Sequence, residues 1–167
     1  MRISIAGKSS NKGYTLIELV AVVVLIGLFL TISVPKLRET LFSSNLKSAV
    51  RRLTGTIEQL RSDAVREHQE LRLNFDLDSE SYWVTSSNMN DKEIEDVTRI
   101  RLPSGVDLID IVSPSGKVMV GSAKIRFSPR GYVEEALIHL GDRSDNVYTL
   151  FLPSFLPKVK IENQYIE

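Results

Sequence analysis

The hydrophobic residues of this chain are concentrated toward its N-terminal end. Residues 14–35 contain a single charged side chain, Glu18, and residues 19–30 form an unbroken apolar run. At about 1.5 Å per residue, a helix of this length spans roughly 30 Å, which matches the hydrocarbon core of a bilayer. The pattern predicts a transmembrane helix over residues 14–35.

Three other structures are compatible with an apolar segment of this kind. A buried core helix would normally have more polar ends. A secretory signal peptide fits the basic start, but its apolar part is usually about 7–15 residues long and holds no carboxylate. A plain transmembrane anchor is the third alternative, and it leaves Glu18 unexplained.

Glu18 is the informative residue of the segment. A carboxylate near the centre of a bilayer costs on the order of 3 kcal/mol, and less toward the interface. The sequence between Lys12 and Lys36 holds no lysine or arginine that could neutralise it. Cleavage between Gly13 and Tyr14 would place an ammonium at Tyr14, one helical turn from Glu18. We therefore expect Glu18 to serve a function that involves such an ammonium.

Residues 36–70 continue the helix with a different pattern. Pro35 lacks an N–H and clashes with the carbonyl of the preceding turn, which predicts a kink but not necessarily the end of the helix. Beyond it, apolar residues recur at steps of three, four and one, so one face of the helix is apolar and the other is charged. The spacing is not the strict heptad of a coiled coil, and we expect the following strands to pack on this stripe. The stripe comprises Leu37, Leu41, Phe42, Leu46, Ala49, Val50, Leu53, Ile57, Leu60, Ala64 and Val65.

From residue 71 onward the periodicity is that of strands. Apolar and polar side chains alternate over residues 71–77, an acidic turn follows, and residues 82–84 form the returning strand. Residues 86–98 are polar and predict a loop. Glycine and proline separate the further strand candidates, which are residues 106–112, 124–127, 135–140, 147–152 and 159–162. The predicted fold class is α+β, with one long helix packed on an antiparallel sheet formed by residues 71–167.

Composition and charge narrow the chemistry. Lysine plus arginine and aspartate plus glutamate both number 21, so the chain has no basic excess that would indicate nucleic-acid binding. There is no cysteine and there are only two histidines, His68 and His139, for which the sequence shows no catalytic companion. The phosphate-loop and nucleophile-elbow motifs are missing as well. We predict no catalytic residue, no cofactor and no metal site.

Two polar clusters have alternative interpretations. Asp76, Asp78 and Glu80 could bind calcium through their oxygens, but the glycine and the remaining ligands of an EF-hand loop are missing, which favours an exposed hairpin turn. The basic residues Lys47, Arg51 and Arg52 are few and mixed with acids, which favours a solvated helix face over a phosphate-binding patch.

The N-terminal segment resembles a known processing signal. It is similar to the type III (prepilin) signal of type IV pilins and type II secretion pseudopilins, in the residues Lys12-Gly13-Tyr14-Thr15-Leu16-Ile17-Glu18-Leu19-Val20. The resemblance implies that residues 1–13 are a leader, removed after Gly13 by a prepilin peptidase that also N-methylates Tyr14. It makes Glu18 the assembly residue. The family usually has phenylalanine where this chain has Tyr14, and both side chains are aromatic.

A second resemblance covers the C-terminal half. Phe127-Ser128-Pro129-Arg130-Gly131, followed by residues 136–140, is similar to the signature of the H-type minor pseudopilin domain (GspH/FimT-like). Residues 61–84 resemble it too, whereas residues 86–122 match poorly. Physically, Pro129 and Gly131 predict a tight turn between strands, with Phe127 in the core.

Together the resemblances imply a pilin-like structural subunit of a type II secretion pseudopilus. The implied protein is a single-pass inner-membrane protein with a cytoplasmic N-terminus and a periplasmic domain. Its implied partners are prepilin peptidase, other pseudopilins or pilins, inner-membrane lipid and the secretion machinery, without nucleic acid. Two alternatives remain open at the level of sequence: a minor pilin of a type IV pilus, and a membrane-anchored enzyme or sensor.

Overall fold

A computed structural model of the chain describes residues 15–155 and 158–167, and the side chains of residues 31–43 lie outside that description. The chain divides into two compact units, Met1–Arg38 and Glu39–Glu167. The helix α1, Leu16–Arg66, contributes residues to both units. The predicted single helix is therefore confirmed, including its continuation through residue 35; the kink at Pro35 remains a prediction.

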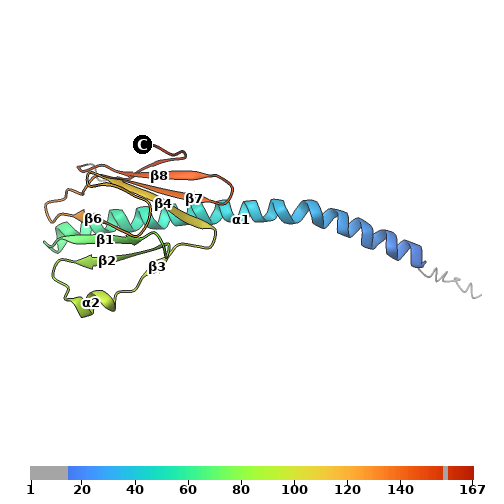
Figure 1. The fold of residues 1–167 in the computed structure, drawn as a ribbon, viewed down its shortest axis with the longest axis horizontal. Helices are drawn as coiled ribbons and strands as arrows, with labels where there is room; N and C mark the ends of the chain where they lie inside the picture. The colour runs from blue at the N-terminus through green and yellow to red at the C-terminus, as the bar shows by residue number, and fades with distance from the viewer. Residues whose placement is uncertain (1–14, 156–157) are drawn as a thin grey trace, which may run out of the picture. The chain divides into compact units, whose positions relative to one another are not determined.

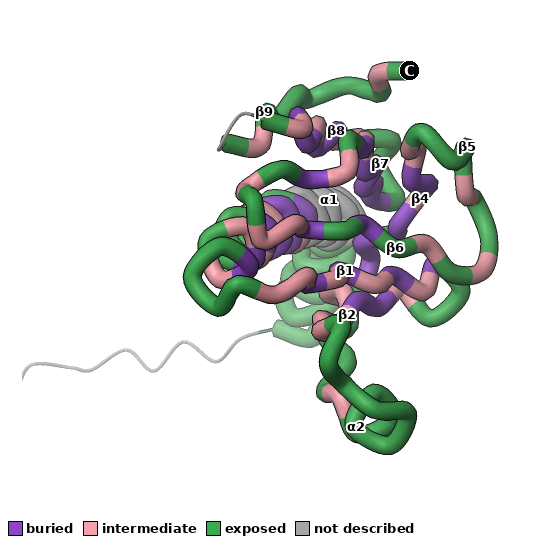
Figure 2. Tube along the Cα trace, turned by 90° about the vertical axis from the view of Figure 1, so that its left-hand side faces the viewer, coloured by how far each residue is buried: buried purple, intermediate pink, exposed green. Residues whose placement is uncertain are grey.

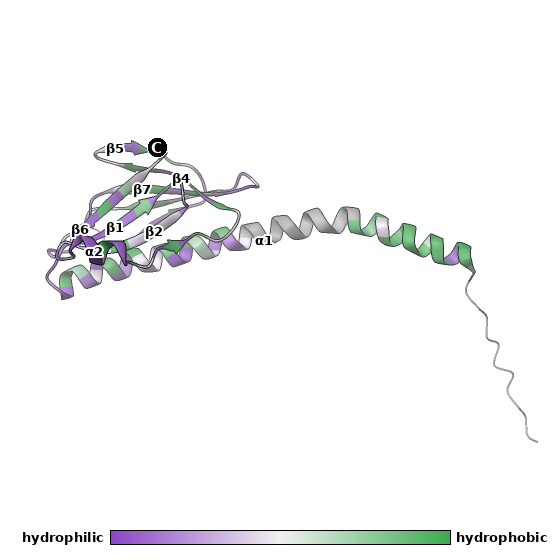
Figure 3. Ribbon diagram, turned by 60° about the horizontal axis from the view of Figure 1, so that its bottom comes forward, coloured by the Kyte–Doolittle hydropathy of each residue, from purple (hydrophilic) through white to green (hydrophobic). Residues whose placement is uncertain are grey.

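In the first unit, the apolar side chains of α1 are not covered by other described residues of the chain. All the large hydrophobic side chains between Leu16 and Leu30 are exposed, from 82% for Leu16 to 47% for Val22. Colouring by hydropathy shows these N-terminal turns as mostly hydrophobic (Figure 3). Within the described part of the chain, no helix meets the length and hydropathy of a membrane span.

In the second unit, α1 forms one layer of the core. The apolar stripe beyond residue 43 is buried as predicted, with the single exception of Val65, which is 43% exposed. The charged residues Lys47, Arg51 and Arg52 of the opposite face are exposed. The helix ends at Arg66, and His68 then takes the left-handed conformation, with a φ of 55°, that commonly follows the last helical turn.

The strands form two antiparallel sheets instead of one (Figure 1). The four-stranded sheet has the order β3-β2-β1-β6, and the five-stranded sheet has the order β5-β4-β7-β8-β9. The first comprises β1 (Leu71–Asp76), β2 (Ser81–Ser86), β3 (Ile100–Arg101) and β6 (Ser122–Phe127). The second comprises β4 (Val106–Ser113), β5 (Gly116–Val118), β7 (Ala136–Asp142), β8 (Val147–Leu152) and β9 (Lys160–Glu162).

Both sheets turn one face toward the helix, and the three layers share one hydrophobic core (Figure 2). Leu53 of α1, Leu73 of β1, Ile125 of β6, Ile138 of β7 and Leu150 of β8 are all fully buried in it. The strand period of two places every second side chain in this core. The prediction that the helix supplies the second layer of a modest β core is confirmed.

Three short elements differ from the sequence-based expectation. The predicted loop 86–98 contains a helix, α2 (Asp91–Glu95), which begins with a capping box between Asn90 and Glu93. The strands β3 and β5 are only two and three residues long, which is too short for an alternating pattern to be recognised in the sequence. The strand β7 extends to Asp142, two residues beyond the end of the predicted strand 135–140, because Gly141 and Asp142 continue the pairing with β4.

Candidate functional site

The structure describes some of the predicted N-terminal site residues and not others. Glu18 lies in the first turn of α1 with its side chain exposed. Pro35 lies within α1, but its side chain is outside the described residues, and so are Gly13 and Tyr14 altogether. The expected approach of the Tyr14 amine to Glu18 therefore stays a prediction.

Glu18 occupies a helix start of a recognisable kind. Thr15 precedes the helix, and the backbone N–H of Glu18 donates to the Thr15 hydroxyl at 3.3 Å and to the Thr15 carbonyl at 3.1 Å. A threonine followed three residues later by glutamate is the sequence of a capping box. A carboxylate in the first turn is also favoured by the helix dipole. These local interactions hold the helix end, but they place no cation beside the carboxylate.

A second polar cluster lies on the five-stranded sheet, on the face opposite α1. Its position depends on a β-bulge at Ile109, where the pairing of β4 with β7 shifts between Leu108 and Asp110. Leu108 faces the core, and without the extra residue Asp110 would face the core as well. The bulge turns Asp110 to the outer face, directly opposite His139 of β7.

The cluster consists of one carboxylate with three partners. The Oδ1 atom of Asp110 lies 2.5 Å from Nδ1 of His139, and its Oδ2 atom accepts a hydrogen bond of 2.9 Å from the Tyr165 hydroxyl. The Lys117 ammonium lies 3.2 Å from the same Oδ2 atom and 2.6 Å from the Tyr165 oxygen. The hydrogen bond to Tyr165, and then that to Asp110, raises the pKa of Lys117.

The cluster attaches the segment after β9 to the sheet. The ring of Tyr165 stacks on that of His139, with centroids 4.0 Å apart. The carbonyl oxygen of Ile166 lies 2.8 Å from Nε2 of His139, and that of Gln164 accepts a hydrogen bond of 2.5 Å from the Thr149 hydroxyl. Residues 163–167 thus form a C-terminal strap that runs over the sheet and covers its polar side chains.

This arrangement has the residues of an acid–base pair but not the geometry of a catalytic one. Asp110 and His139 are 1% and 0% exposed, and both ring nitrogens of His139 are occupied by acceptors of the protein itself. A general base must reach the proton of a substrate directly or through one water. The cluster therefore anchors the strap. The sequence shows no catalytic companion for His139, and the partners that the structure gives it, from positions 110, 165 and 166, are structural.

The two turns singled out in the sequence have structural roles. Phe127 is fully buried, and the turn after it is closed by hydrogen bonds from the Gly131 N–H to the Ser128 carbonyl and from the Ser128 N–H to the Tyr132 carbonyl. Gly131 has a φ of 87°, a conformation that favours glycine. The expected tight turn is confirmed.

The acidic hairpin turn is closed by hydrogen bonds from its backbone N–H groups to the Asp76 carboxylate. Asp76 accepts hydrogen bonds from the N–H groups of Asp78 and Ser79, and the bonds to Ser79 lower the pKa of Asp76. Within the range that the structure describes, no three acidic or histidine side chains are grouped as metal ligands would be.

Two protein families match the chain. Residues 8–34 match the prokaryotic N-terminal methylation motif, and residues 49–150 match the family described as type II transport protein GspH. No curated protein has a significantly similar sequence.

The solved structures that are similar to the chain include two of EpsH, a minor pseudopilin of the type II secretion system of Vibrio cholerae. One is 11% identical, with a TM-score of 0.51 over 71% of this chain and 97% of the other. The second is 12% identical, with a TM-score of 0.55 over 74% and 97% of the two chains. At this level of identity the likeness concerns the fold, which is α+β and pilin-like.

Proposed function

The chain belongs to the GspH family of type II transport proteins, and on this premise we propose that it is a minor pseudopilin, a structural subunit of the filament that drives type II secretion. The family match covers most of the globular unit, and the methylation motif covers the start of α1. The family is one of structural subunits, and the strap-anchoring role of Asp110 and His139 accords with that.

The observation that carries the proposal is the position of Glu18. It is the one charged residue of an otherwise apolar and exposed helical surface that extends to Leu30. Burying that surface against lipid or neighbouring helices is favourable, but burying an unpaired carboxylate with it is costly. An ammonium from a neighbouring subunit would remove that cost, and it would also fix the axial register of the two helices.

The other N-terminal residues have roles in the processing of the chain. Prepilin peptidase removes residues 1–13 after Gly13 and methylates the new N-terminal Tyr14, whose amine pairs with Glu18 of the next subunit. Residues 14–35 cross the inner membrane once, with the leader in the cytoplasm and residues 71–167 in the periplasm. The remaining partners are other pseudopilins, inner-membrane lipid and the secretion machinery.

The test separates assembly from processing. Glu18→Leu should enter the membrane and lose its leader normally. Sheared or cross-linked filaments should contain the wild-type chain but not this variant. The matched control is Glu58→Leu, because Glu58 is an exposed acid on the same helix. Normal incorporation of Glu18→Leu would refute the assembly role. Replacing Gly13 with a bulky residue should instead block cleavage.

A further inference from the structure

On the outer face of the five-stranded sheet, a covered row of polar side chains lies next to an apolar row that is not covered. Residues paired across neighbouring strands point to the same face. Asp110, His139 and Thr149 are paired in this way and lie beneath the C-terminal strap. The next row, Val112, Leu137 and Phe151, is apolar and remains partly exposed.

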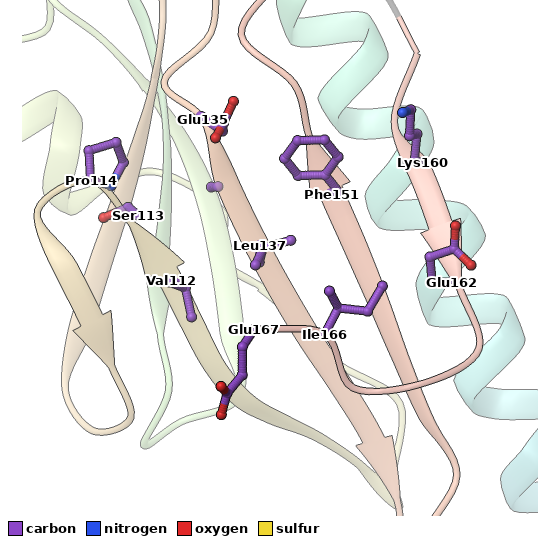
Figure 4. A pocket seen from close by; sticks show the side chains of 11 residues that line it. Val112, Ser113, Pro114, Glu135, Leu137, Phe151, Lys160, Glu162, Ile166 and Glu167 are labelled. Carbon is purple, nitrogen blue, oxygen red and sulfur yellow. The ribbon is translucent and has the colours of Figure 1, made fainter.

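This apolar row forms the floor of a groove with a volume of about 590 Å³ (Figure 4). The turn at Ser113 and Pro114 forms one wall, and β9, with Lys160 and Glu162, forms the other. The strap closes one end through Ile166 and Glu167, while Glu135 stands at the opposite end. The groove is therefore a feature built by the strap and the strands, and it lies away from α1.

The rim of the groove is acidic. Three of its four charged side chains are carboxylates, those of Glu135, Glu162 and Glu167. The fourth, Lys160, lies with its ammonium 5.9 Å from the centroid of the Phe151 ring. An apolar floor within an acidic rim is complementary to an apolar side chain flanked by cations.

The floor also indicates the class of the occupant. Small-molecule sites combine apolar walls with a few polar groups that fix the orientation of the ligand. Here the polar side chains of the sheet face, Asp110, His139 and Thr149, are already bonded to the strap. A floor of aliphatic and aromatic side chains with charges only at the rim is the arrangement of an anchor pocket in a protein–protein interface.

We propose that this groove binds a segment of a partner protein that carries a large apolar side chain next to lysine or arginine. The apolar side chain packs on Leu137 and Phe151, and the cations face Glu135 and Glu162. The inference goes beyond the filament role, because the groove belongs to the globular unit and does not involve Glu18.

The test uses the detergent-solubilised full-length chain and three blocked hexapeptides. The first has two lysines flanking a leucine–phenylalanine pair, the second replaces the lysines with glutamates, and the third replaces the apolar pair with serines. Methyl NMR of Val112, Leu137 and Ile166 reports binding in the groove. We expect the first peptide to bind at least tenfold more tightly than either of the others, with an affinity that falls as salt is added.

Variants of the rim and the floor make the test specific. Glu135→Lys/Glu162→Lys should reverse the preference between the first two peptides, and Leu137→Ser should weaken binding of the first. The control Asp91→Lys/Glu95→Lys makes the same charge change on the exposed α2 and should bind as the wild type does. Equal affinities for the three peptides, or no saturable shift of the groove methyl groups, would overturn the proposal. Either result would leave the filament role of Glu18 intact.

Discussion

Removing the carboxylate of Asp110 should destabilise the globular unit and release the strap. Asp110 is buried with three partners, of which Lys117 is 42% exposed and contributes little. The largest cost in stability arises at His139, because its fully buried ring would keep a polar nitrogen without a partner. Breaking a buried pair by deleting one partner costs about 3–5 kcal/mol, so we expect Asp110→Ala to lower the free energy of unfolding by that amount.

The assay is urea unfolding of the detergent-solubilised chain followed by circular dichroism, combined with NMR of the Tyr165 ring. The ring signals should lose the shift caused by stacking on His139. Replacing both members of the pair with leucine should cost less than replacing Asp110 alone, because no unpaired polar group then remains. The control Glu95→Ala, on the exposed α2, should stay within about 0.5 kcal/mol of the wild type. A loss below about 1 kcal/mol for Asp110→Ala, or unchanged Tyr165 signals, would refute the anchoring role.

Two further substitutions test the packing and charge of the sheets. A Cβ atom at Gly141 would lie 2.9 Å from Cδ1 of Ile109, so Gly141→Ala should lower the free energy of unfolding by about 1 kcal/mol. Adding Ile109→Val should restore part of it in urea unfolding, and no rescue would contradict this explanation. Burial, and then the neighbouring Asp107, raises the pKa of Glu80. Because a raised carboxyl pKa lowers stability as pH rises through it, Glu80→Gln should stabilise by about 0.5 kcal/mol at pH 7 and have less effect at pH 4. An equal increase in thermal stability at both pH values would contradict the conclusion that the Glu80 charge destabilises the fold.

The elements with a strong period could be predicted from the sequence. The stripe of α1 and the alternation in β1 gave the helix and the first hairpin, because each buries one face. The division of the strands into two sheets could not be predicted, because it depends on long-range pairing such as that of β1 with β6. The short α2 had a usable signal in the Asn90–Glu93 capping box.

The polar cluster and the groove could not be predicted, because they depend on register. Asp110 and His139 are 29 residues apart, and they meet only because the bulge at Ile109 changes the face on which Asp110 lies. The partial exposure of Leu137 likewise depends on where the strap crosses the sheet. Glu18 was different, since a single carboxylate in an apolar run is visible without any tertiary structure.

The most direct test of the filament role is the N-terminal residue and mass of the protein recovered from membranes. The proposal predicts that the N-terminal residue is N-methylated Tyr14 and that the mass lacks residues 1–13. Only this N-terminus supplies an amine one helical turn from Glu18. A protein that begins at Met1, or beyond Val34, would lack that amine and would contradict the account.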